Sequence, residues 1–285
     1  MRRRIFALAA TAVLILTMAV PGSAVTNGEF DGEDHPMVGM SVYFFLTDHD
    51  DDLDTPDVLE VSHRCSGTLI SPTVYVTAGH CTFGMDKAML WFAADVESDR
   101  PENGYPFFDD PANEYFDAWG APGWTVTGDP HTFDEYDDNA FFLNDLGVVV
   151  LDEPVDLDEY GSLPTAGQFD DLKVGRTTTF TSVGYGLQLA NGAFVVGERI
   201  RYRANPWLVQ KDAPGFTGSF SFLLSNNAAT GGTCFGDSGG PNFIGDSLTI
   251  AGITSYGLNL ACGGTGGVWR LDRQDALDWV SSFLD

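Results

Sequence analysis

Basic residues are scarce in this chain. Only 14 of the 285 residues are lysine or arginine, against 41 acidic residues, so the formal charge at neutral pH is −27. A surface this acidic repels the phosphates of nucleic acids and the head groups of anionic lipids, which excludes both as expected partners. The chain has only three lysines, and this excess of carboxylates also indicates a salty habitat. There, salt screens the repulsion between the carboxylates, and the carboxylates keep the protein surface hydrated.

Cysteine is rare as well, and no pair has the CxxC spacing. The four cysteines are Cys65, Cys81, Cys234 and Cys262. Their spacing gives a zinc site little support, and we expect neither a metal nor a cofactor. In an exported protein an even number of cysteines predicts two disulfides, for which the sequence alone permits three pairings.

The first 24 residues resemble a secretory signal peptide. Three arginines precede an apolar run from Ile5 to Val20, and small residues lead up to Ala24. A membrane anchor is the alternative, although the run is near the short end for a span. We expect cleavage after Ala24 and a secreted, extracellular protein whose formal charge, without three arginines, becomes −30.

The rest of the chain reads as short strands. Apolar or alternating runs are separated by Gly, Pro, Asn and Asp, with 33 glycines and no internal repeat or long linker. This pattern predicts an all-β barrel or sandwich. At the C-terminal end, residues 273–285 change to helical spacing, with Ala276, Trp279, Val280 and Phe283 on one side. That spacing predicts a terminal amphipathic helix packed on the β body.

Two acidic stretches interrupt the strand pattern. Six of the ten residues from Asp48 to Asp57 are aspartate, and residues 95–138 contain 13 acids and one basic residue. A calcium loop is one interpretation of the first stretch, but an EF-hand frame has Leu53 where glycine is required and Leu59 where glutamate is required. Solvated surface loops are the favoured interpretation of both.

Three motifs carry residues suited to nucleophilic catalysis. They are "VTAGHC" around His80, "NDLGVVVL" around Asp145 and "GTCFGDSGGPNF" around Ser238. A serine hydroxyl needs a base, an imidazole with a pKa near 6.5 can serve as one, and a carboxylate can orient the ring. The glycines flanking Ser238 suit a sharp turn that presents backbone N–H groups to a substrate oxygen. Taken singly, GDSGG can be a tight turn and Asp145 can cap a strand.

Together, and in this order, the three motifs resemble the trypsin/chymotrypsin family of serine proteases. The resemblance runs from about Val25 to the terminal helix and weakens in the acidic stretches. It implies two six-stranded antiparallel β-barrels packed face to face, with a C-terminal α-helix. The implied division is a first barrel over about 25–165, a second over about 166–270, and the helix over about 273–284.

The resemblance also implies residue roles. Ser238 would be the nucleophile, His80 the general base and then acid, and Asp145 the orienting carboxylate. The N–H groups of Gly236 and Ser238 would form the oxyanion hole. The disulfides would pair Cys65 with Cys81 and Cys234 with Cys262. The four remaining histidines, His35, His49, His63 and His131, are expected to be structural or exposed.

The implied specificity pocket lacks a carboxylate. Trypsin-like members have Asp two residues before the cysteine of the serine motif, whereas this chain has Gly232. The other residues assigned to the pocket are Thr233, Ser255, Tyr256, Gly257 and Gly267. Cleavage after Lys or Arg is therefore disfavoured, and an apolar or aromatic side chain is favoured.

The segment "VTNG" from Val25 resembles the activating amino terminus of the family. There, a new terminal ammonium pairs with the aspartate before the catalytic serine, which is Asp237 here. Because Val25 directly follows the expected cut after Ala24, signal removal itself would activate the enzyme, with no propeptide.

We therefore expect a monomeric secreted serine endopeptidase that acts on protein or peptide substrates and has protein inhibitors as a second class of partner. One alternative is a binding protein on the same fold that has lost catalysis. Another is an esterase that uses the same triad, because the acyl-transfer chemistry is shared.

Overall fold

The computed structural model describes residues 25–47, 58–98, 126–191, 194–212 and 220–284. The expected signal peptide, the acidic stretch 48–57 and residues 99–125 of the second acidic stretch lie outside these ranges, so the interpretations given to them remain predictions. Within the described residues, no helix is both long and apolar enough to cross a membrane.

The first barrel is closed and has six antiparallel strands in the order β2-β3-β4-β7-β6-β5. They are β2 (Val38–Thr47), β3 (Val58–Leu69), β4 (Val74–Thr77), β5 (Lys87–Trp91), β6 (Val126–Thr132) and β7 (Gly147–Leu151). The short helix α1 (Gly79–Thr82) follows β4, and the 3-10 helix η2 (Asp138–Leu143) precedes β7. Valine is the commonest buried residue, followed by leucine, as expected for strands whose inner faces pack together.

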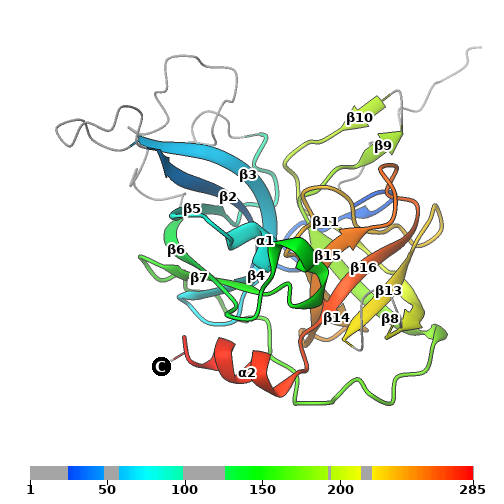
Figure 1. The fold of residues 1–285 in the computed structure, drawn as a ribbon. Helices are drawn as coiled ribbons and strands as arrows, with labels where there is room; N and C mark the ends of the chain where they lie inside the picture. Colours follow the sequence, from blue (N-terminus) through cyan, green and yellow to red (C-terminus); the bar gives the residue numbers. More distant parts are fainter. Residues whose placement is uncertain (1–24, 48–57, 99–125, 192–193, 213–219, 285) are drawn as a thin grey trace, which may run out of the picture.

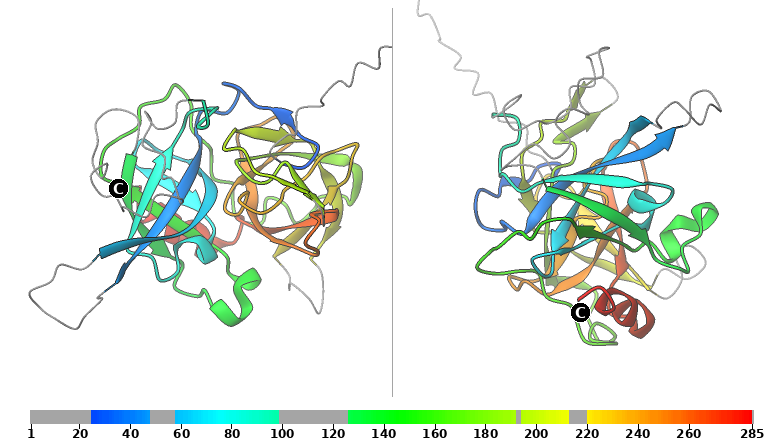
Figure 2. Two further views of the ribbon diagram at one scale, coloured as in Figure 1. Left: turned by 90° about the horizontal axis from the view of Figure 1, so that it is seen from above. Right: turned by 90° about the vertical axis from the view of Figure 1, so that its left-hand side faces the viewer.

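The second barrel closes because β8 also pairs with β14, which gives the order β8-β12-β13-β16-β15-β14. Its strands are β8 (Gly175–Gly184), β12 (Trp207–Lys211), β13 (Ser221–Asn226), β14 (Pro241–Ile244), β15 (Ile250–Gly257) and β16 (Gly264–Arg270). A small hairpin of β9 (Leu189–Asn191) and β10 (Phe194–Val196) extends from it, and β11 (Tyr202–Ala204) pairs with β8. The two barrels lie side by side in Figures 1 and 2, as the family resemblance implies.

The amino-terminal segment lies on the second barrel, although it precedes the first barrel in the sequence. Strand β1 (Glu29–Phe30) pairs with β11, and Thr26 forms a bridge with Gly232. Residues 25–30 thus belong with the second barrel, whereas the sequence-based division placed them in the first.

Arg201 fastens this segment to both barrels. Its guanidinium is fully buried and forms a 3.0 Å ion pair with Asp31. It also donates to the carbonyl oxygens of Val38 and Phe92 and to the hydroxyl of Tyr185, at 2.9–3.2 Å. Because these four partners sit on different segments, one buried cation with its carboxylate fixes how the segments meet.

Helix α2 (Gln274–Ser281) ends the fold and packs on the first barrel, below it in Figure 1. Ala276 and Val280 are buried in the first-barrel core, and Trp279 packs against Phe133 at 5.3 Å between ring centroids. The amphipathic helix expected from the sequence is present, and it begins and ends close to the expected bounds. The chain end thereby returns from the second barrel to the first.

Candidate active site

Strand pairing brings His80 and Asp145 together. Strands β4 and β7 are antiparallel neighbours, with Thr77 opposite Gly147, so the residues just beyond those strand ends lie side by side. His80 Nδ1 lies 2.8 Å from Asp145 Oδ2, and the His80 backbone N–H donates to Oδ1 at 2.8 Å. The carboxylate therefore holds the ring and the backbone of the same histidine, which fixes the orientation of the imidazole.

The electrostatics of this pair favour a basic imidazole. Asp145 is fully buried and accepts a third hydrogen bond, from the Ser255 hydroxyl of the second barrel at 2.5 Å. Burial lowers the pKa of His80, but the charge of Asp145 and its hydrogen bond raise it by more, so the pKa lies above its ordinary value of 6.5. A quarter of the His80 side-chain surface is exposed, and Nε2 has no hydrogen-bond partner among the described residues.

Ser238 sits in a tight loop that crosses from the second barrel towards the first. Gly239 follows it with a φ of +80°, a conformation that favours glycine. A Cβ atom on Gly239 would lie 2.1 Å from Thr77 Oγ1 and 2.3 Å from the Ser66 carbonyl oxygen, both on the first barrel. Glycine at this position lets the serine loop touch the barrel that carries His80.

The backbone of this loop leaves a particular set of amides without acceptors. In the segment from Cys234 to Gly240, every carbonyl from Cys234 to Ser238 accepts a hydrogen bond. Among the described residues, the N–H groups of Phe235, Gly236 and Ser238 donate to no protein acceptor. Two of these three are the amides assigned to the oxyanion hole from the sequence.

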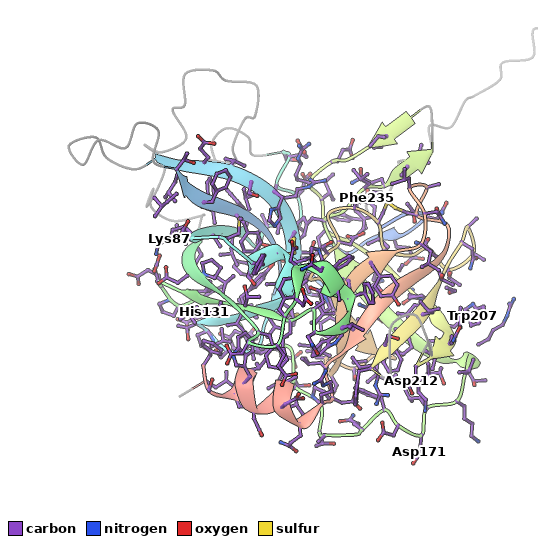
Figure 3. All side chains as sticks on the ribbon, in the orientation of Figure 1. Lys87, His131, Asp171, Trp207, Asp212 and Phe235 are labelled. Atoms are coloured by element: carbon purple, nitrogen blue, oxygen red, sulfur yellow. A yellow bond between two sulfur atoms is a disulfide. The ribbon has the colours of Figure 1, made fainter. Side chains whose placement is uncertain are left out.

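His80 and Ser238 line one cavity of about 360 Å³. Four of the residues assigned to the pocket line it with them: Thr233, Ser255, Tyr256 and Gly257. Cys234 and Cys262 line it too, whereas the sequence did not single out the other lining residues: Tyr136, Asp138, Phe141, Phe235, Thr254 and Asn259. Phe235, half exposed, is labelled in Figure 3 near the middle of the molecule, whereas Lys87 and Trp207 lie at its outer edges.

Gly267, also assigned to the pocket, is not among the residues that line this cavity, although it lies against the ring of Tyr256, which does line it. A bulge between Thr254 and Tyr256 shifts the β15–β16 register, so Gly257 pairs with Gly266. A Cβ on Gly267 would lie 2.2 Å from the ring of Tyr256, whereas one on Gly266 would lie 2.8 Å from Thr233 Oγ1. Gly266 is therefore the glycine beside Thr233, which lines the cavity.

Gly232 has no room for a side chain. A Cβ there would lie 2.2 Å from the carboxamide carbon of Asn226, a residue that is 2 % exposed. The Asn226 amide accepts from the Thr26 hydroxyl at 3.0 Å and donates to the Thr233 carbonyl at 2.8 Å. The space that a side chain at position 232 would enter is thus filled by a neutral amide from β13, and neither residue is among those that line the cavity with Ser238.

One wall of the cavity comes from the segment before Asp145. Helix η2 is kinked at Ala140 and contains no buried residue, so neither regularity nor core packing identifies it from the sequence. The rings of Phe141 and His80 pack edge to face with 5.7 Å between their centroids, and those of Phe142 and Tyr256 do so with 6.1 Å. Two aromatic contacts thus join this wall to the residues that line the cleft.

Asp237 and Val25 are both completely buried. The Asp237 carboxylate accepts from the N–H groups of Gly186 at 2.7 Å and Cys234 at 2.8 Å. Burial raises its pKa to about 7, against the opposing effect of these hydrogen bonds and of the Arg64 charge. The Val25 side chain packs with Tyr202 and Ala204.

Both disulfides are formed in the pairing that the resemblance implies. Cys65–Cys81 joins β3 to the helix that carries His80, and Cys234–Cys262 joins the serine loop to the opposite wall of the cavity. His63 also lies near the first disulfide, and its Nε2 is 3.0 Å from the Cys81 carbonyl oxygen. Because both sulfur atoms are in the disulfide, this cluster is structural.

Comparison with known proteins decides the family. The trypsin family model matches residues 124–280, which is more than half of the chain and includes Asp145 and Ser238. The chain belongs to the trypsin family. A relative within it is brachyurin of Leptuca pugilator, 28 % identical over 225 residues, which cover 78 % of this chain and 84 % of brachyurin.

Solved structures share the trypsin-family fold at low sequence identity. The HL collagenase structure matches with a TM-score of 0.63 at 16 % identity, over 90 % of this chain and 97 % of that one. Human heparin-binding protein matches with a TM-score of 0.60 at 18 % identity, over 91 % and 96 %. One of these proteins is named for hydrolysis and the other for binding, so the shared fold does not distinguish an enzyme from a binding protein. Only the residues in the cleft can do so.

Proposed function

We propose that this trypsin-family protein is a serine endopeptidase with His80, Asp145 and Ser238 as its catalytic triad. The observation that carries the proposal is their arrangement in one cleft. Asp145 holds the imidazole of His80 at 2.8 Å, and Ser238 lines the same cavity beside two backbone amides that have no protein acceptor. A binding protein on this fold has no need to retain all of these groups.

The chemistry follows from their positions. Ser238 Oγ attacks the peptide carbonyl carbon while its proton passes to Nε2 of His80. The carbonyl oxygen becomes an oxyanion that the N–H groups of Gly236 and Ser238 stabilise. His80 then gives its proton to the leaving amine as the C–N bond breaks. Water, deprotonated by the same imidazole, releases the acyl group and regenerates the serine.

The expected preference is for an apolar or aromatic side chain at the cleaved bond. The neutral Asn226 amide at the Gly232 position supports this, because a buried Lys or Arg would find no carboxylate there. Phe141, Tyr256 and the disulfide Cys234–Cys262 give the cavity apolar walls. Asp138, at the opposite wall, is exposed to solvent and is a weak partner for a buried cation.

Activation would follow from cleavage before Val25. The buried Asp237 carboxylate, with a pKa raised to about 7, would gain a charged partner if the new Val25 ammonium reached it. Uncut, Val25 has a φ of +61°, which is strained for a β-branched residue. Cleavage removes the preceding peptide group and with it that strain, which supports Val25 as the natural terminus of the active form.

We further propose that residues 1–24 direct export and that the enzyme is monomeric and extracellular. Its partners would be protein or peptide substrates and protein inhibitors. Two disulfides fit an oxidising compartment. The acidic surface argues against nucleic acid and, after signal removal, against anionic membranes.

Casein hydrolysis and hydrolysis of a p-nitrophenyl ester test the activity, with Ser238→Ala as the matched variant. We expect the protein that begins at Val25 to cleave both substrates and the variant to cleave neither. Ester cleavage without casein or peptide cleavage would instead identify an esterase. No cleavage of either would identify a binding protein on the trypsin-family fold.

A further inference from the structure

Ser66, on strand β3 of the first barrel, lies behind the loop that carries the proposed oxyanion hole. It is completely buried, and all of its polar groups are engaged. Its backbone N–H donates to the Ser238 carbonyl at 2.7 Å, and its carbonyl accepts from the Thr77 hydroxyl at 2.9 Å. The residue is thus fixed by its own barrel on one side and reaches the serine loop on the other.

The Ser66 hydroxyl adds two bonds that a glycine or alanine would lack. It donates to the Gly236 carbonyl at 2.9 Å and accepts from the Tyr185 N–H at 3.0 Å. Tyr185 precedes Gly186, whose N–H donates to Asp237 at 2.7 Å. One hydroxyl therefore links β3, the serine loop and the segment that holds the Asp237 carboxylate.

These contacts constrain the peptide groups of the serine loop from behind. With the carbonyls of Gly236 and Ser238 tied to Ser66, rotation of either peptide plane breaks a buried hydrogen bond. A buried hydroxyl left without partners is costly, so the loop conformations that break these bonds are disfavoured. The amides of Gly236 and Ser238 have no protein acceptor and belong to the adjacent peptide groups, whose carbonyls accept from the N–H groups of Leu187 and Gly240. Ser66 therefore acts on these amides through the Cα atoms that the neighbouring peptide groups share.

We infer that Ser66 is a positioning residue for the oxyanion hole, holding the Gly236–Ser238 backbone from the opposite barrel so that its amides are oriented before substrate binds. This inference rests on the proposed function. Preorganised donors stabilise the charge that develops in the transition state, because they need no reorganisation at that moment. Ser66 should therefore affect the transition state more than the ground state.

The test uses the protein that begins at Val25, with Ser66→Ala and Ser66→Gly as variants. Thr68→Val is the matched control, since Thr68 is a buried residue on the same strand whose hydroxyl donates to Met37 instead. For each protein we would measure kcat and KM on one peptide and the melting temperature. The fraction of active enzyme is set by titration with a serine reagent, so partial misfolding does not enter kcat.

Two inhibitors separate positioning from general structure. A peptidyl trifluoromethyl ketone forms a bond from Ser238 Oγ to its carbonyl carbon, the oxygen becomes an alkoxide in the oxyanion hole, and the serine proton passes to His80. The corresponding peptide acid, the reaction product, binds without that alkoxide. The ratio of their affinities reports on the oxyanion hole and is insensitive to a uniform loss of binding.

For Ser66→Ala we expect kcat to fall about 5- to 10-fold with little change in KM, less than the roughly 10²- to 10³-fold loss expected when an oxyanion donor itself is removed. Affinity for the ketone should fall by the same factor, with product affinity unchanged. Ser66→Gly should give the same changes as Ser66→Ala, and Thr68→Val should lower only the melting temperature.

Unchanged kcat in both Ser66 variants, or equal losses of affinity for ketone and product, would overturn the inference. A parent protein without cleavage or ketone adduct would overturn the proposed function itself.

Discussion

The carboxylate of Asp145 accepts a 2.5 Å hydrogen bond from the hydroxyl of Ser255, although the two residues come from different barrels. Asp145 precedes a strand of the first barrel, and Ser255 lies on β15 of the second. This contact and those of Ser66 show that the cleft is bridged by hydrogen bonds at both the acidic end of the triad and the serine loop. The relative position of the barrels is therefore coupled to the geometry of the proposed catalytic residues.

The first prediction concerns Asp145. Asp145→Asn should lower kcat by about 10⁴-fold with little change in fold, because an amide N–H facing His80 would favour the wrong tautomer. Ser255→Ala should cost far less, on the order of tenfold, since the carboxylate keeps both bonds to His80. Steady-state kinetics on one peptide checks both. Equal losses for the two variants would contradict the separate roles given to them.

The second prediction concerns the acidic limb of the pH–rate profile. His80 must be neutral to accept a proton, and the neighbouring Asp145 charge raises its pKa above 6.5 despite the opposing effect of burial. Activity should therefore be lost as the pH falls through a value higher than 6.5, and kcat/KM against pH measures it. A limb below pH 6.5 would mean that burial outweighs the carboxylate.

The third prediction tests the corrected pocket. Gly266→Asp should introduce a carboxylate beside Thr233 and raise kcat/KM for cleavage after Arg relative to Phe about tenfold or more. Gly267→Asp is the control, because its side chain would collide with the Tyr256 ring rather than lie beside Thr233. Paired peptides that differ only at the cleaved residue give the ratio. A gain in Arg cleavage by Gly267→Asp alone would restore the original assignment.

The fourth prediction concerns the buried Asp237. In a chain extended before Val25, its pKa is raised from 3.8 to about 7, so the folded state holds the proton more tightly than the unfolded state. This contribution to stability is present below about pH 4 and is lost as the pH rises towards 7. In the protein that begins at Val25, pairing with the new ammonium should remove the loss.

Melting temperatures of the extended and Val25-terminal proteins, measured between pH 4 and 8, check this sign. The extended protein should lose stability relative to the other as the pH rises, and Asp237→Asn in the extended protein should abolish the trend. A constant difference across this range would show that Val25 and Asp237 do not pair.

Sequence motifs predicted the parts of the site that lie within short contiguous stretches. His80, Asp145 and Ser238 each sit in a recognisable motif, and the apolar residues of the terminal helix recur at helical spacing. The sequence alone therefore identified the three residues and the helix. The barrels and both disulfides then follow from the family. The catalytic roles of the three residues remain predictions that the experiments above test.

Other features depend on contacts between distant segments. Gly266 rather than Gly267 lies beside Thr233 because a bulge near Ser255 shifts the strand register, and a bulge leaves no clear mark in the residue pattern. Ser66 bonds to Gly236 across 170 residues, and Thr26 bonds to Asn226 across 200 residues. Arg201 looks like an exposed residue in an alternating strand, yet it is fully buried by its partners.

The most direct test of the central claim is mass spectrometry of the Val25-terminal protein after reaction with phenylmethylsulfonyl fluoride. Attack by an activated serine on the sulfonyl group expels fluoride and leaves one sulfonyl adduct. The account predicts about one adduct per molecule, located on Ser238, and none in His80→Ala under the same conditions. An unmodified wild-type protein, or an adduct at any other residue, would contradict it.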